Sequence, residues 1–199
     1  DIVMHSATKF IGGNSSCLAG SLATNREDLA NHIKSFKNAT GCGLSPMDSW
    51  ICLEGIKTMA LRVQEKQKNA KKVAEFLAKH PKVKKVNYPG LSGNPGYELH
   101  HKQAHGPGSV ISFTTDSLPL SMQVCKDTTY FGMSVSFGGV ESSICLPWYT
   151  SHSAVPEGEK KQIGLTKDLV RLSVGIENAD QLIEDLKQAL AKDPLAALN

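Results

Sequence analysis

The sequence predicts an α/β fold in which short strands alternate with helices. Three observations support this prediction. Apolar runs of strand length end at glycine or proline, a helical pattern spans residues 47–80, and an amphipathic helical pattern spans residues 180–192. Of the 199 residues, 40% are hydrophobic and 21% are charged, a composition typical of a globular protein with a packed core.

The N-terminal part of the chain predicts two strands and a helix. Residues 1–4 are expected to form a short buried strand and residues 17–24 a second strand, with the glycine-rich loop FIGGNSS between them. Asn25 is expected to cap a helix that runs to about Lys37, because acidic residues follow it in the first turn. The segment GCGLSP then interrupts the helical pattern.

A long helix is expected over residues 47–80, with a kink or an interruption at Gly55. After Pro81 the pattern changes to short strands and loops. A strand and turn are predicted at 83–90, strands at 109–115 and 169–177, and helices at 120–126 and 180–192.

Alternation along the strand at 169–177 separates two kinds of side chain. Val170, Leu172 and Val174 would lie on one face, and Arg171 and Ser173 on the other. The arginine therefore projects from an otherwise apolar strand, either into solvent or toward a ligand.

The charge pattern argues against a nucleic-acid partner. The formal net charge is +3, the pI is about 8.6, and lysines and arginines are spread along amphipathic stretches. The densest basic run, at 82–85, predicts a solvated edge strand, because lysine at an edge discourages pairing between chains. No apolar run approaches the roughly 20 residues that span a bilayer, so no membrane partner is expected.

The cysteines and histidines do not predict a metal site. The chain has five scattered cysteines, Cys17, Cys42, Cys52, Cys125 and Cys145. None belongs to a CxxC pair, so they are expected to be reduced thiols of an intracellular protein. His100, His101 and His105 are expected to form a surface cluster in a polar loop.

Lys9 is the first candidate for chemistry. It follows an apolar strand and stands close to two hydroxyl side chains, Ser6 and Thr8. A desolvated lysine is a nucleophile that forms a Schiff base with a carbonyl, and hydroxyl groups donate hydrogen bonds to a phosphate. On this pattern alone, a solvated loop lysine remains an alternative.

A series of motifs resembles the Cys/Met-metabolism enzymes that use pyridoxal phosphate. The resemblance begins with DIVMHSATKFIGG, which is similar to the family's Schiff-base lysine segment. It continues through GLSPMDSW, GIKTMALRV, NAKKVAEFL, VNYPGL, SVSFGGVES and DLVRLSVGIENADQLIEDLKQAL, and so covers essentially the whole chain. Within the family, the sequences of these motifs are most similar to those of the plant cystathionine β-lyases.

The resemblance implies a fold type I transferase architecture. Residues 1–57 would be the C-terminal part of the large cofactor-binding domain, and residues 58–199 the small C-terminal α+β domain, linked by the long helix. In the family, an aromatic side chain, an acid, a phosphate-binding loop and a Tyr/Arg pair from a neighbouring subunit complete the site, all upstream of the lysine. The chain alone is therefore expected to be catalytically incomplete, and a homotetramer built as a dimer of dimers is implied.

The resemblance also assigns roles to individual residues. Lys9 would bind the cofactor, pyridoxal 5'-phosphate, and move protons between the substrate α-carbon and the leaving group. Ser6 and Thr8 would hold the cofactor phosphate. Arg171 would bind the substrate α-carboxylate as a bidentate fork, and Ser136 lies in the segment that helps to seat the same carboxylate.

Val135 bears on the class of reaction. Relatives that act at the γ-carbon often have an acidic residue at this place, so an apolar side chain favours β-elimination. The implied reaction converts cystathionine, an amino-acid thioether, to homocysteine, pyruvate and ammonia, as a step of methionine biosynthesis in the cytoplasm or a plastid. A related carbon–sulfur lyase or γ-synthase of the same family is an alternative.

Two departures from the family leave a non-catalytic alternative open. The family sequence G-H-S-D is replaced here by GNSS at 13–16, and Glu54 stands where relatives often have arginine. Both changes are compatible with a truncated homologue that has an assembly or regulatory role. The retained Lys9 and Arg171 favour an enzyme.

Overall fold

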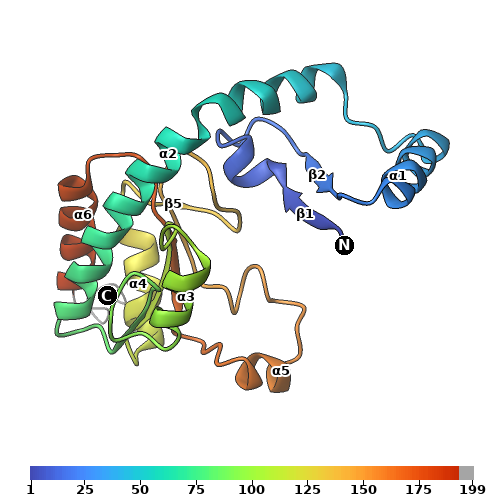
Figure 1. The fold of residues 1–199 in the computed structure, drawn as a ribbon. Coiled ribbons are helices and arrows are strands. Elements are labelled where there is room, and N and C mark those ends of the chain that lie inside the picture. Colours follow the sequence, from blue (N-terminus) through green and yellow to red (C-terminus); the bar gives the residue numbers. More distant parts are fainter. Residues whose placement is uncertain (193–199) are drawn as a thin grey trace. The chain divides into compact units, whose positions relative to one another are not determined.

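A computed structural model describes residues 1–192 of the chain (Figure 1). The chain divides into two compact units, Asp1–Leu61 (unit 1) and Arg62–Asn199 (unit 2), and the boundary lies within the long helix α2 (Pro46–Lys79). The division at residue 57 into a cofactor domain and a small domain stays a prediction.

Unit 1 contains a two-stranded antiparallel sheet made of β1 (Val3–Ser6) and β2 (Gly20–Ala23). Its register pairs Val3 with Ala23 and Ser6 with Gly20. Both predicted strands are confirmed, the first shifted by two residues and the second with shorter bounds. The prediction that the first strand is buried is wrong, because β2 is its one partner in the described chain and all four residues of β1 are exposed.

The segment between the two strands is more ordered than a glycine loop. It begins with a π-helical turn, η1 (Ala7–Ile11), which was not predicted. The amides of Gly12 and Gly13 donate to the carbonyls of Ala7 and Lys9 at 2.7 and 2.8 Å and so close this turn. The turn therefore fixes the backbone on both sides of Lys9.

Helix α1 (Glu27–Thr40) confirms the helix predicted from residue 25, but its N-cap is Arg26 rather than Asn25. The Arg26 amide donates to Thr24 Oγ1 at 3.1 Å, and its guanidinium donates to the Asp28 carboxylate at 2.6 Å. These bonds begin the helix one residue later than predicted. The helix ends at Gly41, where φ is +71°.

Helix α2 (Pro46–Lys79) is continuous, so an interruption at Gly55 is wrong, whereas the kink stays a prediction. Ser45 Oγ accepts a hydrogen bond from the Asp48 amide at 3.0 Å and caps the first turn. Gly55 instead permits close packing, because a Cβ atom there would collide with the carbonyl oxygens of Ile11 and Gly12. The glycine thus brings the backbone that follows Lys9 against α2.

Unit 2 contains a mixed five-stranded sheet in the order β3-β4-β7-β6-β5. Its strands are β3 (Lys85–Asn87), β4 (Val110–Thr114), β5 (Gly132–Met133), β6 (Ser143–Cys145) and β7 (Val170–Ser173). Neighbouring strands are antiparallel except β5 and β6, which are parallel. Of the basic run at 82–85, Lys85 lies in β3 at one edge of the sheet, so the predicted edge strand is confirmed with a later start.

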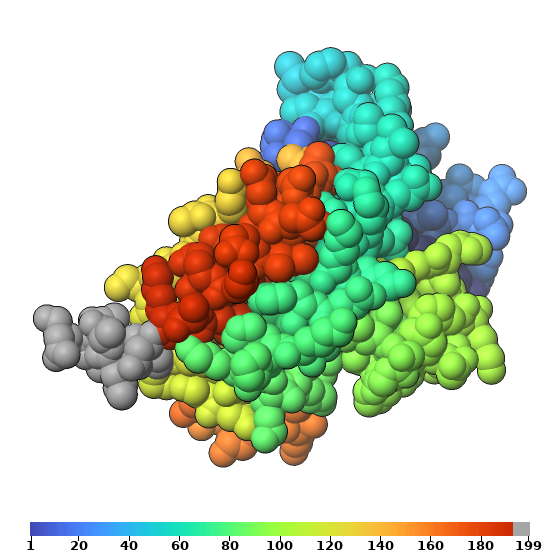
Figure 2. Space-filling model, turned by 90° about the vertical axis from the view of Figure 1, so that its left-hand side faces the viewer, coloured from blue at the N-terminus to red at the C-terminus, as the bar shows by residue number. Residues whose placement is uncertain are grey.

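Unit 2 also contains four helices beyond α2 in the described chain: α3 (Tyr97–Gln103), α4 (Leu118–Asp127), α5 (Glu157–Gln162) and α6 (Ala179–Ala191). The predicted helices at 120–126 and 180–192 are thereby confirmed. Helix α3 contains His100 and His101, so the predicted polar loop at these histidines is wrong. Figure 2 shows α6 beside the second part of α2, and Lys72 of α2 lies 3.7 Å from Asp180 of α6.

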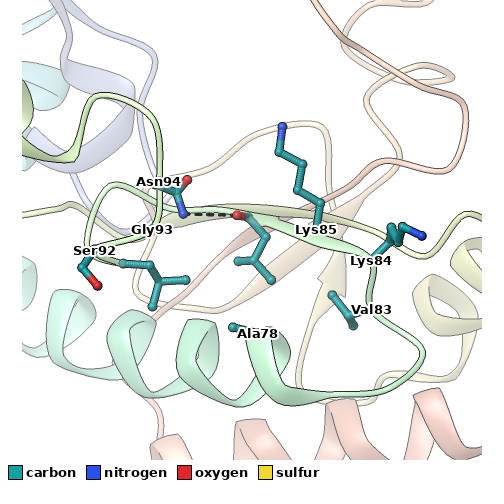
Figure 3. A pocket seen from close by; sticks show the side chains of 9 residues that line it. Ala78, Val83, Lys84, Lys85, Ser92, Gly93 and Asn94 are labelled. Carbon is teal, nitrogen blue, oxygen red and sulfur yellow. Dashed lines mark hydrogen bonds between the residues drawn. The ribbon is translucent and has the colours of Figure 1, made fainter.

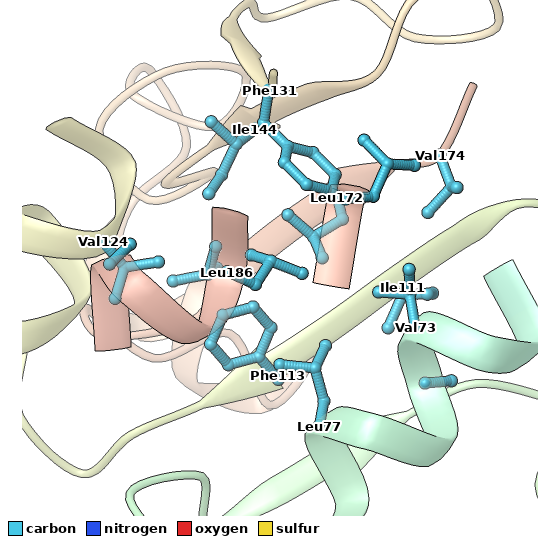
Figure 4. Packing of buried hydrophobic residues seen from close by; sticks show 14 of the residues in the cluster. Val73, Leu77, Ile111, Phe113, Val124, Phe131, Ile144, Leu172, Val174 and Leu186 are labelled. Carbon is cyan, nitrogen blue, oxygen red and sulfur yellow. The ribbon is translucent and has the colours of Figure 1, made fainter. Parts of the chain in front are cut away.

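The core of unit 2 lies on one face of the sheet. The register places Leu172 of β7 between Ile111 of β4 and Ile144 of β6, and all three are fully buried. Helices α2, α4 and α6 contribute Val73, Leu77, Val124 and Leu186 to the same cluster (Figure 4). Burial of one such side chain stabilises the fold by roughly 1.5–3 kcal/mol.

A buried carboxylate joins α6 to the loop that follows α4. Asp185 is 5% exposed and accepts hydrogen bonds from the Thr129 amide at 2.9 Å and from the Tyr130 amide at 2.8 Å. Thr129 Oγ1 donates to it as well, at 3.0 Å. Removal of this carboxylate would leave several donors without an acceptor.

We therefore expect Asp185→Ala to lower the free energy of unfolding by about 2–4 kcal/mol, since hydrogen bonds to a buried charged group are lost together. The measurement is urea denaturation of the full chain. Glu184→Ala is the matched control, because Glu184 is exposed and pairs only with Lys187 on its own helix among the described residues. Equal losses in the two variants would contradict this role of Asp185.

Candidate functional site

Lys9 lies in the π-helical turn that follows β1. Its φ and ψ, −83° and −114°, are not helical, so the backbone changes direction at this residue. Its side chain is half-buried. The hydrogen bond from the Gly13 amide to the Lys9 carbonyl, at 2.8 Å, holds the backbone of the turn at this residue.

The two hydroxyl groups beside Lys9 differ in their availability. The Thr8 hydroxyl donates to the Ala19 carbonyl at 3.2 Å and accepts from the Ala19 amide at 2.9 Å, which joins η1 to the segment before β2. Its one proton is thus already used, and a phosphate would have to displace the Ala19 carbonyl. Ser6 is exposed at the end of β1 and makes no side-chain cap bond with the turn.

Arg171 lies in β7, in the middle of the sheet of unit 2. It pairs in register with Ser112 of β4 and Cys145 of β6, so its side chain is on the face opposite the Leu172 core. The guanidinium carbon is 5.2 Å from the centroid of the Phe137 ring. This contact lies within the range of a cation–π interaction.

The structure brings Arg171 and Ser136 together. Arg171 Nη2 donates to the Val135 carbonyl at 2.9 Å and to the Ser136 carbonyl at 3.3 Å. In the described chain, Nε and Nη1 of Arg171 make no hydrogen bond, so they remain available to an incoming carboxylate. The backbone at 135–136 therefore orients a guanidinium fork.

The loop that carries Ser136 is itself anchored to the end of β7. Ser173 Oγ accepts from the Gly138 amide at 3.3 Å. Glu177 accepts hydrogen bonds from both the amide and the hydroxyl of Ser142, at 2.5 and 2.9 Å, and Ser142 Oγ accepts from the Gly175 amide at 2.9 Å. These bonds hold the loop over the strand that supplies Arg171.

The predicted site residues thus form two groups. Ser6, Thr8 and Lys9 lie together in unit 1, and Ser136 and Arg171 lie together in unit 2. The sequence analysis identified all five residues as candidates, but it did not predict that Glu177 anchors the loop. The sequence indicates this role of Glu177 only weakly, because an acidic residue shortly after a strand is common.

Lys66 of α2 is a further unusual residue that the sequence analysis missed. It is fully buried, and desolvation together with the nearby Arg62 charge lowers its pKa to about 8. Helical spacing places it in line with the buried Ala70, Val73 and Leu77. That alignment of a lysine with the apolar face was the signal available in the sequence.

Two hollows in unit 2 contain none of the predicted site residues. One, of about 350 Å³, lies beside β3, where Asn94 Nδ2 donates to the Val86 carbonyl at 3.2 Å (Figure 3). The other, of about 750 Å³, is mainly apolar and is lined by α4 with Met133 and Tyr149. Neither hollow offers the amine and guanidinium groups of the predicted site.

Within residues 1–192, no group of three or more histidine, cysteine, aspartate or glutamate side chains is arranged to bind a metal ion. None of the helices in this part of the chain has the length and apolarity that spanning a membrane requires.

A family model described as "Cys/Met metabolism PLP-dependent enzyme" matches residues 1–191. Chloroplastic mimosinase of Mimosa pudica is 69% identical over 194 residues, which are 98% of this chain and 44% of that protein. Chloroplastic cystathionine β-lyase of Mimosa pudica is 58% identical over 195 residues, or 98% of this chain and 43% of that protein. The chain spans less than half the length of these relatives.

Solved structures give the same result at the level of the fold. Cystathionine γ-synthase of Xanthomonas oryzae pv. oryzae, in complex with cystathionine, matches with a TM-score of 0.94 and 34% identity over 100% of this chain and 51% of that one. Cystathionine γ-lyase of Lactobacillus plantarum, complexed with L-serine, matches with a TM-score of 0.92 and 36% identity over 96% of this chain and 50% of that one. The predicted fold type I architecture is confirmed.

The residues of unit 1 fit the cofactor of this family, pyridoxal 5'-phosphate. The Lys9 amine matches its aldehyde, and the exposed Ser6 hydroxyl matches its phosphate. Thr8 fits only after its bond to Ala19 is exchanged.

The buried Lys66 leads to a pH-dependent stability. The pKa in the folded chain, about 8, lies below the ordinary value of 10.5, so between these pH values the unfolded chain binds more protons than the folded one. Stability from this group therefore rises with pH across that window, by as much as about 3 kcal/mol. We expect Lys66→Met to remove the rise.

The measurement is the free energy of unfolding at pH 7, 8, 9 and 10 for the original chain and the variant. Subtracting the two series cancels the titration of all other groups. Lys68→Met is the control, because Lys68 is exposed and pairs with Glu65. A difference between original and Lys66→Met chains that does not change with pH would contradict the assignment.

Proposed function

The chain belongs to the Cys/Met metabolism family of pyridoxal-phosphate-dependent enzymes, and from this premise we propose that the complete protein is a carbon–sulfur lyase. Its proposed reaction is β-elimination from cystathionine, which gives homocysteine, pyruvate and ammonia in methionine biosynthesis. The observation that carries this proposal is the guanidinium of Arg171, oriented by the carbonyls of Val135 and Ser136 with two nitrogens available.

Arg171 is proposed to bind the substrate α-carboxylate. Because Nη2 is held by two carbonyl oxygens, the plane of the guanidinium is fixed before a substrate arrives. A planar fork of N–H donors fits a carboxylate through two parallel hydrogen bonds, and here one N–H of Nη2 would have to join Nε or Nη1 in that fork. Ser136, whose carbonyl accepts one of the orienting bonds, supports this arrangement through its backbone.

Lys9 is proposed to hold the cofactor and to move protons. When bound, pyridoxal phosphate supplies an electron sink that stabilises negative charge at the substrate α-carbon. Lys9 Nζ, on a turn whose backbone is closed by hydrogen bonds, would take the α-proton and deliver a proton to the departing sulfur. Ser6 Oγ and, after exchange of its Ala19 bond, Thr8 Oγ1 would donate to the cofactor phosphate.

The elimination is proposed to occur at the β-carbon because of Val135. This side chain is 60% exposed in unit 2, and its own carbonyl accepts from Arg171. A substrate held by Arg171 would therefore meet an apolar residue nearby rather than an acid. An acid there would favour the proton transfers that reactions at the γ-carbon need.

A second candidate is the activity for which the mimosinases are named. The mimosinases of Mimosa pudica and Leucaena leucocephala are 69% and 65% identical to this chain, whereas the cystathionine β-lyases of Mimosa pudica and Arabidopsis thaliana are 58% and 52% identical. Steady-state rates of the complete protein with cystathionine and with mimosine would separate the two. A higher specificity constant for mimosine would favour the second candidate.

The non-catalytic alternative rests on two departures from the family sequence, at residues 13–16 and at Glu54. The side-chain bonds described below for these departures stay within their own loop or helix. Asn14 Oδ1 accepts from the Ser16 amide at 3.2 Å within its own loop. Glu54 is exposed and pairs with Lys57 on α2 at 2.5 Å. Since neither side chain contacts the turn that carries Lys9 in any bond described, we favour the enzyme.

Two further properties are proposed from the relatives. The plant cystathionine β-lyases and mimosinases are named as chloroplastic, which favours a plastid over the cytoplasm. A dimer of dimers is proposed from the family resemblance.

Lys9→Ala should abolish the visible absorbance of bound pyridoxal phosphate and reduce turnover of the complete protein by orders of magnitude, because both the covalent attachment and the proton carrier are lost. The measurement combines an absorbance scan after dialysis with an assay of pyruvate release. Lys37→Ala, an exposed lysine in the last turn of α1, is the control and should leave both readouts unchanged. Unchanged turnover in Lys9→Ala would contradict the role.

Arg171→Lys keeps the positive charge but loses the planar fork, so the change should not be conservative. We expect the specificity constant of the complete protein to fall by an amount equivalent to about 2–4 kcal/mol, the scale of a lost charged hydrogen-bond pair. Arg26→Lys, at an exposed arginine of unit 1, serves as the control. A specificity constant within about threefold of the original would show that Arg171 does not hold the substrate.

A further inference from the structure

Two cysteines of unit 1 lie against each other. The Sγ atoms of Cys17 and Cys52 are 3.5 Å apart, although the residues are 35 positions apart in the sequence. Cys17 lies between η1 and β2, and Cys52 lies on α2. Both are free thiols, and Cys17 is buried while Cys52 is half-buried.

The pair is close to the turn that carries Lys9. A Cβ atom on Gly12 would be 3.4 Å from Cys17 Sγ and 3.0 Å from the Ala7 carbonyl, so the thiol packs against the end of η1. The backbone of Gly12 also packs against α2 at Gly55, one turn after Cys52. The two sulfur atoms therefore lie where the Lys9 segment meets the long helix within unit 1.

We propose that Cys17 and Cys52 form a modification site, at which a small-molecule disulfide such as oxidised glutathione converts the two thiols into an intramolecular disulfide. A disulfide bond is about 2.05 Å long, so the two sulfur atoms must approach by about 1.5 Å. The proposal requires rotation about the side-chain torsion angles to supply this movement. The folded chain has already brought the two thiols together, so the loop between them need not be closed again.

The exposure of the two residues sets the order of the reaction. The Cys52 thiolate, which is the more accessible, attacks one sulfur of the small disulfide, and one thiol of that molecule leaves. The Cys17 thiolate then attacks the sulfur of Cys52 and displaces the second thiol. Two cysteines are oxidised, one disulfide is reduced to two thiols, and the two protein protons end on those thiols.

The surroundings of Cys17 disfavour its thiolate form. Burial, the hydrogen bond with Cys52 and the nearby charge of Asp48 all raise the pKa of Cys17. A larger share of Cys17 is therefore protonated at neutral pH, which lowers the concentration of the thiolate that attacks the mixed disulfide. The reaction should accelerate as the pH rises.

The remaining cysteines do not share this geometry. Cys42 is exposed, and its thiol contacts the hydroxyl of Thr40. Cys125 and Cys145 are buried in unit 2, where desolvation raises the pKa of Cys125 to about 12. Cys42 therefore offers a matched control in the same unit.

A disulfide here would join α2 covalently to the segment that follows Lys9. It would limit the movement of η1 relative to α2 within unit 1, and it would be reversed by an excess of reduced thiol. The oxidation state of the pair would thus govern how freely the backbone around Lys9 moves.

The test equilibrates the full chain with defined ratios of reduced and oxidised glutathione, followed by acid quenching, alkylation and mass spectrometry with peptide mapping. The same titration is repeated in concentrated guanidinium chloride. We expect a Cys17–Cys52 link whose equilibrium constant is at least tenfold larger in the native chain than in the denatured one, since folding raises the effective concentration of the two thiols. Native and denatured constants that agree would overturn the proposal.

Variants identify the two steps. Cys17→Ser should stop at the mixed disulfide on Cys52, Cys52→Ser should react far more slowly, and Cys42→Ser should behave as the original chain. A link that survives Cys17→Ser with Cys42 as the partner, or a peptide map without a Cys17–Cys52 link at every ratio, would overturn the proposal. Far-UV circular dichroism of each variant verifies that it remains folded.

Discussion

Alternation of side chains along β7 is the constraint on which unit 2 depends. Pairing in register with β4 and β6 aligns Leu172 with Ile111 and Ile144, and the helices cover that face. The same alternation points Arg171 to the opposite face. A shift of the register by one residue would bury the guanidinium and expose the leucine, so the hydrophobic core itself fixes where the arginine stands.

Unit 1 uses backbone contacts to achieve a similar result for Lys9. The turn is closed by the amides of Gly12 and Gly13, tied to the next segment through Thr8, and packed against α2 at Gly55. Glycine is needed at that last position because any side chain would collide with the turn. The backbone at Lys9 is thus held by three sets of contacts, which suits a residue proposed to bind a cofactor.

The sequence predicted most of this fold because its signals are local and periodic. Alternation identified β4 and β7, helical spacing identified α2, α4 and α6, and the basic run identified the edge strand β3. The failures have physical causes. Gly55 resembled a helix break but serves tertiary packing, and the cap of α1 moved to Arg26 through bonds to Thr24 and Asp28. The apolar residues 2–4 predicted burial, but all four residues of β1 are exposed. The candidate site residues were predicted from motifs. The contacts of Arg171 with the carbonyls at 135–136 required coordinates, because they join segments far apart in the sequence. The burial of Lys66 required them as well, because it depends on the residues packed around it.

The central claim is that Lys9 is the residue to which the cofactor attaches. Borohydride reduction of the complete protein loaded with pyridoxal phosphate, followed by peptide mass spectrometry, tests it most directly, because reduction makes the attachment permanent. The account predicts one phosphopyridoxyl group per chain, carried by Lys9, with the other lysines unmodified. A label spread over surface lysines, or one concentrated on another residue such as Lys66, would contradict it.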